Sequence, residues 1–395
     1  MNNEMRNVVI LTFLAVIELF SSTIAEAYPT FIGYGYTTCT VCHYNPYGNG
    51  PLTDYGRALS ATAIAARPPY STKKTTDEKL GAESQFLADF IKLPELIRPS
   101  LNYRGLYYAT GIKNRPTENY ITMKADAAIA LQFVPNEFFI VASIGYTPIP
   151  EGSGQVSGST TTPSEWISRE HYVAFKPSRE LGFYMGMMDV VYGIRIPDHI
   201  AFSRSRTLLA QNDQTHGALI HYLTKKYELG LHGFLGNQFQ EEGVRISGVS
   251  VKAELEPVEK LKVGASFFSA ASNFRGRWMT ALHGKVGFAE GSGIITEFGI
   301  TRDRIKNQAL VSGVYGLFQS MHKVFRGFHL ISTFEYYTHD LNANLSRTFR
   351  ITPGIQYFPM QRLEMRLELQ STRILSEPAV NPDAMAVLAQ FHVWF

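Results

Sequence analysis

Five consecutive residues, Cys39-Thr40-Val41-Cys42-His43, carry the clearest chemical signal in this chain of 395 residues, and these two cysteines are the only ones it has. In the pattern Cys-x-x-Cys-His, one short turn separates two thiols that can add to the vinyl groups of a haem. The adjacent imidazole can then bind the iron as its proximal ligand. The motif therefore predicts one covalent haem c, with Cys39 and Cys42 as attachment sites and His43 as iron ligand.

Three other interpretations of the two cysteines compete with haem attachment. In an exported protein, Cys39 and Cys42 could form a local disulfide. A structural zinc site needs four ligands, whereas this cluster offers three and has no second Cys/His pair nearby. A thioredoxin-like redox pair would need a βαβ context that the remaining sequence does not supply. Haem attachment is the favoured interpretation, and the disulfide stays open beside it.

The first 27 residues have the features of a secretory signal peptide. Met1 to Arg6 form the n-region, the apolar run Val8 to Ile17 forms the h-region, and Ala25-Glu26-Ala27 is a typical cleavage site. The apolar run is too short for a membrane-spanning helix, which needs roughly 20 apolar residues. We therefore expect an exported mature chain that starts near Tyr28.

Composition and charge narrow the class of protein. Aromatic residues make up 13% of the chain, yet the mean hydropathy is −0.08. This combination is typical of a membrane β-barrel, whose strands alternate between lipid-facing and lumen-facing residues, so that the two kinds average out. The formal net charge is +3 and the Lys and Arg residues are scattered, which gives no support to nucleic-acid binding.

The chain divides into three units: the signal peptide at 1–27, a small haem segment at 28–98 and a β-barrel at 99–395. In the haem segment we predict short helices at 53–66 and 77–91, the first capped by Thr53. The barrel region has period-two alternation, seen clearly where Leu363, Met365, Leu367 and Leu369 face one way and the polar residues between them face the other. It predicts a mainly β, porin-like antiparallel transmembrane barrel of about 16 strands. The predicted strands lie near 101–112, 119–134, 137–148, 165–177, 180–192, 216–224, 226–238, 244–256, 260–272, 277–289, 292–303, 307–320, 325–338, 346–358, 362–374 and 384–395.

The connections between strands predict the orientation in the membrane. Tight turns are expected at Pro135-Asn136, Pro177-Ser178, Lys225-Lys226 and Pro257-Val258, whereas other connections are long. Short turns at one end and longer loops at the other are the asymmetry of bacterial outer-membrane barrels, and they place both termini in the periplasm. The haem segment would then lie in the periplasm or in the lumen. The longest loop, 193–215, could fold into the lumen or stand outside.

The second iron ligand is not supplied by the haem segment itself. His43 is the only histidine between Tyr28 and Ser100, and that stretch has no methionine. A six-coordinate iron would take its other ligand from the barrel, from a less common donor such as Lys or Tyr, or from water. Alternation places His221, His232, His283, His329 and His392 on the lumen face. The candidate distal ligands are His199 in the long loop, His221, His232 and His283.

The chain resembles the fused outer-membrane cytochrome-porins of iron-oxidising bacteria, in which a short monohaem segment precedes a barrel of about sixteen strands. The matching residues are Phe31, the motif at 39–43, and Leu52-Thr53-Asp54-Tyr55-Gly56-Arg57, which is similar to that family's Leu/Phe-Gly-Arg element. Across the barrel the resemblance is architectural. The stretch from Asn45 to Pro51 is more Gly-rich than that family leads us to expect.

This resemblance implies electron transfer across the outer membrane through the haem. The donor would be extracellular, such as ferrous iron, and the acceptor a periplasmic carrier such as a soluble c-type cytochrome. It also implies that Gly56 and Arg57 pack beside the haem, where the planar guanidinium of Arg57 can pair with a propionate.

Two further hypotheses belong to different classes of protein. One is a diffusion porin whose haem segment is a plug or sensor, and the other is a haem-free barrel with a disulfide between Cys39 and Cys42. The sequence shows no nucleophile-base constellation, phosphate loop or paired acid/base carboxylates, so a hydrolase or transferase is not favoured. The lipid bilayer is an expected partner in every case, and both a monomer and an oligomer stay open.

Overall fold

The computed structural model describes residues 29–67, 76–112, 115–146, 166–198, 200–207, 209–240, 242–342, 347–376, 379–380 and 384–395. The predicted signal peptide, residues 1–27, lies outside the described residues. Among the residues that are described, none of the helices is both long enough and apolar enough to cross a membrane.

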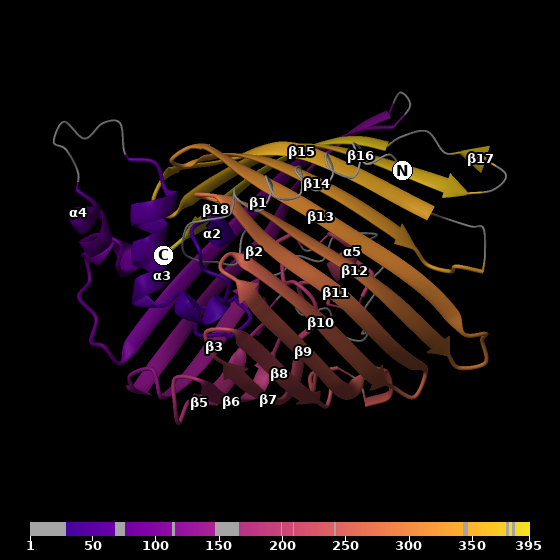
Figure 1. Ribbon diagram of the computed structural model, residues 1–395, viewed down its shortest axis with the longest axis horizontal. Coiled ribbons are helices and arrows are strands. Elements are labelled where there is room, and N and C mark those ends of the chain that lie inside the picture. The colour runs from indigo at the N-terminus through magenta and orange to yellow at the C-terminus, as the bar shows by residue number, and fades with distance from the viewer. Residues whose placement is uncertain are drawn as a thin grey trace, which may run out of the picture.

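The polypeptide from Ile97 to Trp394 forms one closed antiparallel β-barrel (Figure 1). The sheet has eighteen strands, but β4 and β5 both pair with β3, and β17 and β18 both pair with β16. The segments β4 and β5 therefore act as one interrupted strand, as do β17 and β18, and the barrel wall has sixteen strands. The wall closes because β1 pairs with both β2 and β18. The predicted fold class is confirmed.

Each strand segment predicted from alternation overlaps a strand of the structure. The bounds are β1 Ile97–Ile112, β2 Arg115–Val134, β3 Phe138–Tyr146, β4 Trp166–Ile167, β5 His171–Phe175, β6 Leu181–Met188, β7 Thr215–Leu223, β8 Tyr227–Phe234, β9 Ser247–Val258, β10 Leu261–Ala271, β11 Arg275–Ala289, β12 Ser292–Ile305, β13 Val311–Phe325, β14 Phe328–Thr338, β15 Arg347–Met360, β16 Leu363–Ser376, β17 Ala379–Val380 and β18 Ala384–Trp394.

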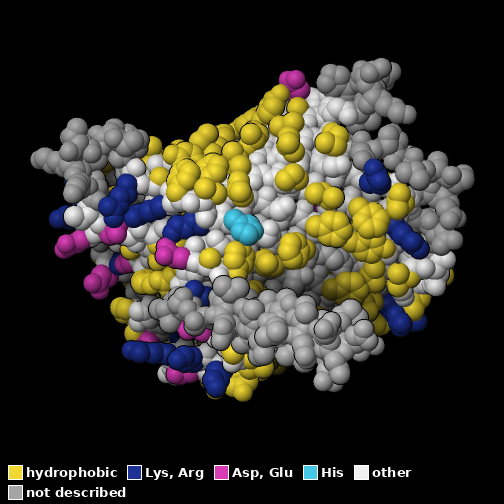
Figure 2. Space-filling model, turned by 45° about the horizontal axis from the view of Figure 1, so that its top comes forward, with side chains coloured by type: hydrophobic (Ala, Val, Ile, Leu, Met, Phe, Trp, Pro, Cys, Tyr) yellow, Lys and Arg dark blue, Asp and Glu magenta, His cyan; other side chains and the backbone are white. Residues whose placement is uncertain are grey.

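The wall has an apolar outside and a polar inside. On β16, Met365, Leu367 and Leu369 are about half exposed at 49%, 46% and 53%, whereas Glu364 and Arg366 are buried. Hydrophobic side chains dominate the middle of the face in Figure 2, and most of its acidic side chains lie toward the left end. An outer surface of this kind suits hydrocarbon, because a lipid-facing strand residue needs no hydrogen-bond partner.

The two ends of the barrel differ. At one end, two to five residues connect β2 to β3, β5 to β6, β7 to β8, β9 to β10, β11 to β12, β13 to β14 and β15 to β16. Loops at the other end include 189–214 and 235–246. β1 starts and β18 ends at the short-turn end, so the N-terminal segment and Phe395 lie there, as predicted. The turn expected at Pro257-Val258 is instead at residues 259–260, where Lys260 has a φ of 62°.

The N-terminal segment consists of short helices: α2 Pro29–Gly33, η1 Cys39–Val41, α3 Asp54–Leu59, η2 Ser60–Ile64, α4 Asp77–Ala82 and η3 Phe86–Asp89. Thr53 caps α3 as predicted, since its hydroxyl accepts a hydrogen bond from the Gly56 N–H at 3.1 Å. The helix predicted at 77–91 is interrupted after Ala82. There the Ser84 hydroxyl donates to the Gly81 carbonyl at 2.6 Å, and such local bonds compete with helical ones.

The N-terminal segment packs into the barrel. Ile32 of α2 is fully buried in a cluster with Ile295 of β12 and Leu317 of β13. Farther along, the turn between β13 and β14 holds the segment through Arg326, whose guanidinium donates to the carbonyls of Ala65 at 2.8 Å and Ala61 at 3.1 Å. A segment with a small core of its own thus gains buried area from the barrel wall.

The loop between β6 and β7, residues 189–214, folds into the lumen, and we call it the inner loop. It contains α5 Phe202–Ser205. Its residues Ile194, Ile196, Ala201 and Phe202 are buried, and the Gly193 N–H donates to Ser266 of β10 at 3.0 Å. Of the two positions that the sequence left open for this loop, the structure shows the lumen.

Candidate functional site

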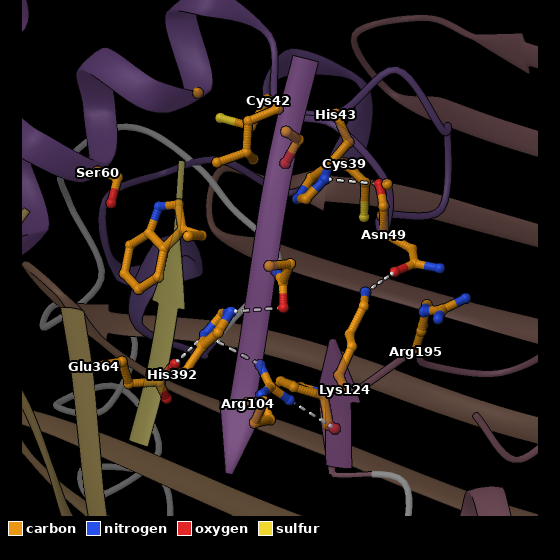
Figure 3. Close-up of a pocket in the computed structure, with 18 of the residues that line it drawn as sticks. Cys39, Cys42, His43, Asn49, Ser60, Arg104, Lys124, Arg195, Glu364 and His392 are labelled. Carbon is orange, nitrogen blue, oxygen red and sulfur yellow. Dashed lines mark hydrogen bonds and ion pairs between the residues drawn. The ribbon is translucent and has the colours of Figure 1, made fainter. Parts of the chain in front are cut away.

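A cavity lies inside the barrel, between the N-terminal segment and the lumen wall (Figure 3). It has a volume of about 250 Å³, near the lower end of the range of about 300–1,000 Å³ that is usual for cofactor pockets. Three units of the fold line it. The N-terminal segment contributes Cys39, Cys42, His43, Asn49 and Phe31; the barrel contributes Arg104, Lys124, Phe358, Glu364, His392 and Trp394; and the inner loop contributes Arg195 and Arg204.

The Cys-x-x-Cys-His motif is a single tight turn. The N–H groups of Cys42 and His43 both donate to the carbonyl of Cys39, at 3.2 and 2.9 Å. This turn brings both thiols and the imidazole to the cavity, Cys42 buried and Cys39 partly exposed. The order of donors agrees with the spacing that haem attachment needs.

α3 packs directly on the motif through Gly56. A β-carbon at this position would lie 2.6 Å from the Cys42 carbonyl oxygen and 2.7 Å from the Cys42 β-carbon. The Thr53 N–H also donates to that carbonyl at 2.8 Å. Only a glycine allows so close an approach, so the Gly-Arg element seen in the sequence supports the motif through its glycine.

His43 is held by a loop that follows it. Its Nδ1 atom lies 3.0 Å from the carbonyl oxygen of Asn49, and a carbonyl only accepts, so Nδ1 carries the hydrogen. Gly48, Asn49 and Gly50 all have positive φ values of 79°, 84° and 63°, a run that curls the chain around the imidazole. The glycine-rich stretch noted in the sequence thus positions the Asn49 carbonyl.

The remaining nitrogen of His43, Nε2, has its lone pair available for a metal. Burial lowers the pKa of His43 to about 4; the Asn49 carbonyl acts against this shift, whereas Arg195 and Lys124 add to it. The ring is therefore neutral at pH 7, the state in which histidine binds metals. A histidine whose Nδ1–H donates to a backbone carbonyl has the tautomer and orientation that metal-binding histidines usually have.

The wall opposite the motif is strongly cationic. Its side chains are Arg104 of β1, Lys124 of β2, Arg169, which precedes β5, and Arg195 and Arg204 of the inner loop. Asp126 forms ion pairs with Lys124 at 3.4 Å and with Arg169. Asp189 pairs with Arg195. Burial lowers the pKa of Arg195 to about 9, with Arg204 as a further cause.

Three of these guanidinium groups are incompletely satisfied. Within the described part of the chain, Nε of Arg104, Nη2 of Arg169 and Nε of Arg204 are buried and have no hydrogen-bond partner. Buried donors on charged groups without an acceptor are costly. An acceptor-rich, anionic group would satisfy such donors, and the two propionates of a haem have this character.

Haem c fits the donor set of the cavity. Cys39 and Cys42 would form the thioether bonds, His43 would bind the iron, the cations would pair with the propionates, and Phe31, Phe358 and Trp394 supply apolar walls. By contrast, the described residues contain no group of three or more His, Cys, Asp or Glu side chains placed to hold a bare metal ion.

Arg57, predicted beside a propionate, lies elsewhere. Its guanidinium donates to the Pro99 carbonyl of β1 and stacks 6.0 Å from the ring centre of Phe86. The cavity lining does not include it. In this structure Arg57 joins the N-terminal segment to the first barrel strand.

Three of the candidate distal histidines, His221, His232 and His283, do not line the cavity. His221 bonds to Glu228 at 3.1 Å and His283 bonds to Glu254 at 2.9 Å, within a charged network in the lumen. His232 is fully buried, and His199 lies outside the described residues. Of the described histidines, only His43 and His392 line the cavity. Alternation had placed His392 in the lumen, but nothing in the sequence set it above the others.

The sequence pattern also did not single out Arg104 and Lys124 of the barrel as cavity residues. Arg104 and Lys124 occupy inward positions of β1 and β2, so alternation contains a signal for them. That signal is shared by many lumen charges, and it does not say which of them meet the motif.

Comparisons with known proteins support the fold. No protein-family model matches the chain, and a search of the curated proteins finds no match. Among solved structures, OmpT of Vibrio cholerae is 10% identical with a TM-score of 0.58, over 77% of this chain and 100% of that one. The outer membrane channel DcaP of Acinetobacter baumannii is 10% identical with a TM-score of 0.55, over 76% and 97%. The anion-selective porin from Comamonas acidovorans is 9% identical with a TM-score of 0.55, over 76% and 99%. These likenesses establish that the barrel is porin-like in its fold.

Proposed function

We propose that this protein is a bacterial outer-membrane cytochrome whose barrel encloses one covalently attached haem c, and that it transfers electrons across the outer membrane. The observation that carries the proposal is the position of Cys39, Cys42 and His43, which line a cavity inside the barrel. The resemblance of the motif and of the Gly56 element to the cytochrome-porins of iron-oxidising bacteria supports the same function.

Enclosure matters for transfer through a membrane. The hydrocarbon layer is about 30 Å thick, so a haem that hangs in the periplasm would leave the whole layer to be crossed. A cavity within the barrel shortens that distance. The haem would supply one-electron chemistry at its iron when bound, and burial and hydrogen bonding around it would set its potential.

The residues of the chain have separable tasks in this proposal. Cys39 and Cys42 hold the group, and the Asn49 carbonyl orients His43. The cations opposite the motif neutralise the propionates. The inner loop excludes water that would enter from the loop end of the barrel, since its residues Ile196 and Phe202 are buried in the lumen.

The partners follow from the two ends of the barrel. A periplasmic carrier such as a soluble c-type cytochrome would dock at the short-turn end, beside the N-terminal segment. The donor would approach from the loop end, and ferrous iron is the substrate that the family resemblance suggests. Such a protein would act as a ferrous-iron oxidase only together with its carrier.

A second candidate function is a diffusion porin with a haem-bearing plug or sensor. The solved structures similar in fold favour it, because two of them are an outer membrane channel and an anion-selective porin. The contents of the lumen favour electron transfer instead. Buried apolar clusters join the inner loop to the wall, as with Tyr192, Phe268 and Tyr315, and a solute path gains nothing from them.

The test starts with protein purified from outer membranes of a host that attaches c-type haem. Reduced-minus-oxidised and pyridine haemochrome spectra are compared with those of a Cys39→Ala/Cys42→Ala variant. Covalent haem in the parent and none in the variant is the expected result. Haem reduction by Fe(II) in liposomes, followed by oxidation by a soluble cytochrome on the opposite side, would then support electron transfer.

Two results would overturn the proposal. A parent protein without haem would leave a barrel with a Cys39–Cys42 disulfide. A haem protein that conducts ions in planar bilayers, with a conductance that changes with haem redox state and without electron transfer to the carrier, would favour the plugged porin.

A further inference from the structure

We propose that His392 of β18 would bind the haem iron as its second protein ligand, together with His43; this inference rests on the proposed function. Both histidines line the one cavity. Figure 3 shows the ring of His43 above the cavity and that of His392 below, each on its own side of the space between the motif and the barrel wall. His43 is in the N-terminal segment, and His392 belongs to the last strand of the barrel.

His392 has the supporting contacts of a metal-binding histidine. Its Nδ1 lies 3.0 Å from Oε2 of Glu364 on the neighbouring strand β16. A carboxylate accepts, so this contact keeps the hydrogen on Nδ1 and leaves Nε2 with a lone pair. Carboxylate–histidine–metal arrangements of this kind fix the tautomer and orientation of the ring.

Two further side chains, Arg104 and Asn102, lie within hydrogen-bonding distance of the ring nitrogens of His392. Nη2 of Arg104 also lies 3.3 Å from Nδ1. A guanidinium only donates, so the Nδ1 hydrogen that the proposal requires goes to Glu364, the nearer of the two groups, and not to Arg104. Nε2 lies 3.2 Å from the side-chain oxygen of Asn102. With an unprotonated Nε2, the Asn102 amide would present its nitrogen, since the two ends of an amide look alike.

Other ligands are less suited. The histidines of the described lumen apart from His392 do not line the cavity, and neither does any described methionine. Lys124 does, but its ammonium donates to the Asn49 side chain at 3.0 Å and pairs with Asp126 at 3.4 Å. A lysine must lose its charge to bind iron, and Lys124 would have to give up both of these contacts as well.

The setting around His392 is apolar on the side of the N-terminal segment. The ring of Trp394 packs against that of His392 at a tilt of 36°, with ring centres 4.8 Å apart, and it also contacts Phe358 at 6.5 Å. An imidazole backed by an indole and a carboxylate has little freedom to turn away. The ring of His392 is therefore already oriented before a haem binds.

The test compares His392→Gln with His283→Gln in the full-length haem protein. Both changes keep side-chain size and hydrogen bonding in the lumen, but only the first is at the cavity. The readouts are haem content by pyridine haemochrome, the ferric absorption and EPR spectra, and binding of carbon monoxide to the ferrous form. None of them depends on electron-transfer activity.

The parent and His283→Gln should be low-spin and should not bind carbon monoxide. His392→Gln should keep its covalent haem, become high-spin in most molecules and bind carbon monoxide, and added imidazole should restore the low-spin spectrum. If His392→Gln prevents folding, His392→Met keeps a ligand; its expected result is a low-spin haem with a higher potential, because methionine ligation raises it.

The outcomes separate the two proposals. A high-spin parent, or a His392→Gln variant that stays low-spin, would overturn the role of His392 while the haem protein stands. A spectrum that changes in Lys124→Met and stays unchanged in His392→Gln would assign the ligand to Lys124 instead. A parent without haem would remove the proposed function itself.

Discussion

A β-carbon on Gly56 would lie 2.6 Å from the carbonyl oxygen of Cys42. This relationship ties the packing of α3 to the geometry of the attachment motif. The atom that such a β-carbon would meet belongs to the backbone, and a backbone atom cannot rotate aside as a flexible side chain can.

Gly56→Ala should therefore push α3 away from the motif. Overpacking of this kind costs roughly 1–3 kcal/mol, and the expected result is a several-fold lower yield of covalent haem in membranes with an equal amount of folded barrel. The ratio of haemochrome to barrel protein measures this yield, and heat-modifiable migration on a gel checks that the barrel is folded. Gly276→Ala is the control, because a β-carbon there meets nothing within 4 Å; equal losses in both variants would contradict the packing explanation.

Lys124→Gln should lower the reduction potential of the haem. Removing a partly buried positive charge favours the oxidised, more positive form, and each 1.4 kcal/mol of differential stabilisation corresponds to about 59 mV for one electron. We expect a decrease of tens of millivolts by spectroelectrochemical titration. Lys285→Gln removes a buried lysine in the lumen that does not line the cavity, and its potential should match that of the parent.

The haem-free chain should depend on pH through His43. Its pKa is about 4 in the folded protein and about 6.5 when unfolded. The unfolded state binds more protons between these values, so stability is complete above pH 6.5 and decreases as the pH falls toward 4, by at most ~3 kcal/mol. Limited proteolysis of the N-terminal segment in Cys39→Ala/Cys42→Ala measures this. Adding His43→Gln should flatten the profile, and an unchanged profile would exclude His43 as its source.

Arg326→Ala should loosen the N-terminal segment without unfolding the barrel. The side chain donates to two carbonyls and pairs with Asp77 at 3.1 Å. It is partly exposed, so we expect about 1–2 kcal/mol in total, or about tenfold faster proteolysis of the segment. Arg304→Ala, at an exposed position of β12, should digest at the parent rate.

The sequence predicted the barrel well because strand alternation is a local property. Leu363 to Gln370 reveal their inward and outward faces within eight residues, whatever they pair with. The attachment motif is local in the same way. The second ligand that we propose beside His43 is not local, since its identity depends on how sixteen strands are staggered and on which wall the segment enters. Several lumen histidines therefore looked equivalent.

Arg57 shows a different limit. Gly56 and Arg57 are adjacent in sequence, but successive residues of a helix point about 100° apart. When Gly56 contacts Cys42, Arg57 is directed toward Pro99 instead. A motif that predicts where a helix packs does not predict that each of its residues faces the same site.

His392 and Arg104 are directly paired across β18 and β1, the strands that close the barrel. One wall of the cavity thus exists only once the first and last strands have met. Until then the N-terminal segment has no complete site to enter, and afterwards the wall surrounds it. In the function proposed above, attachment before closure would spare the haem a passage through the finished wall, so that maturation in the periplasm and insertion into the membrane would need to be coordinated in time.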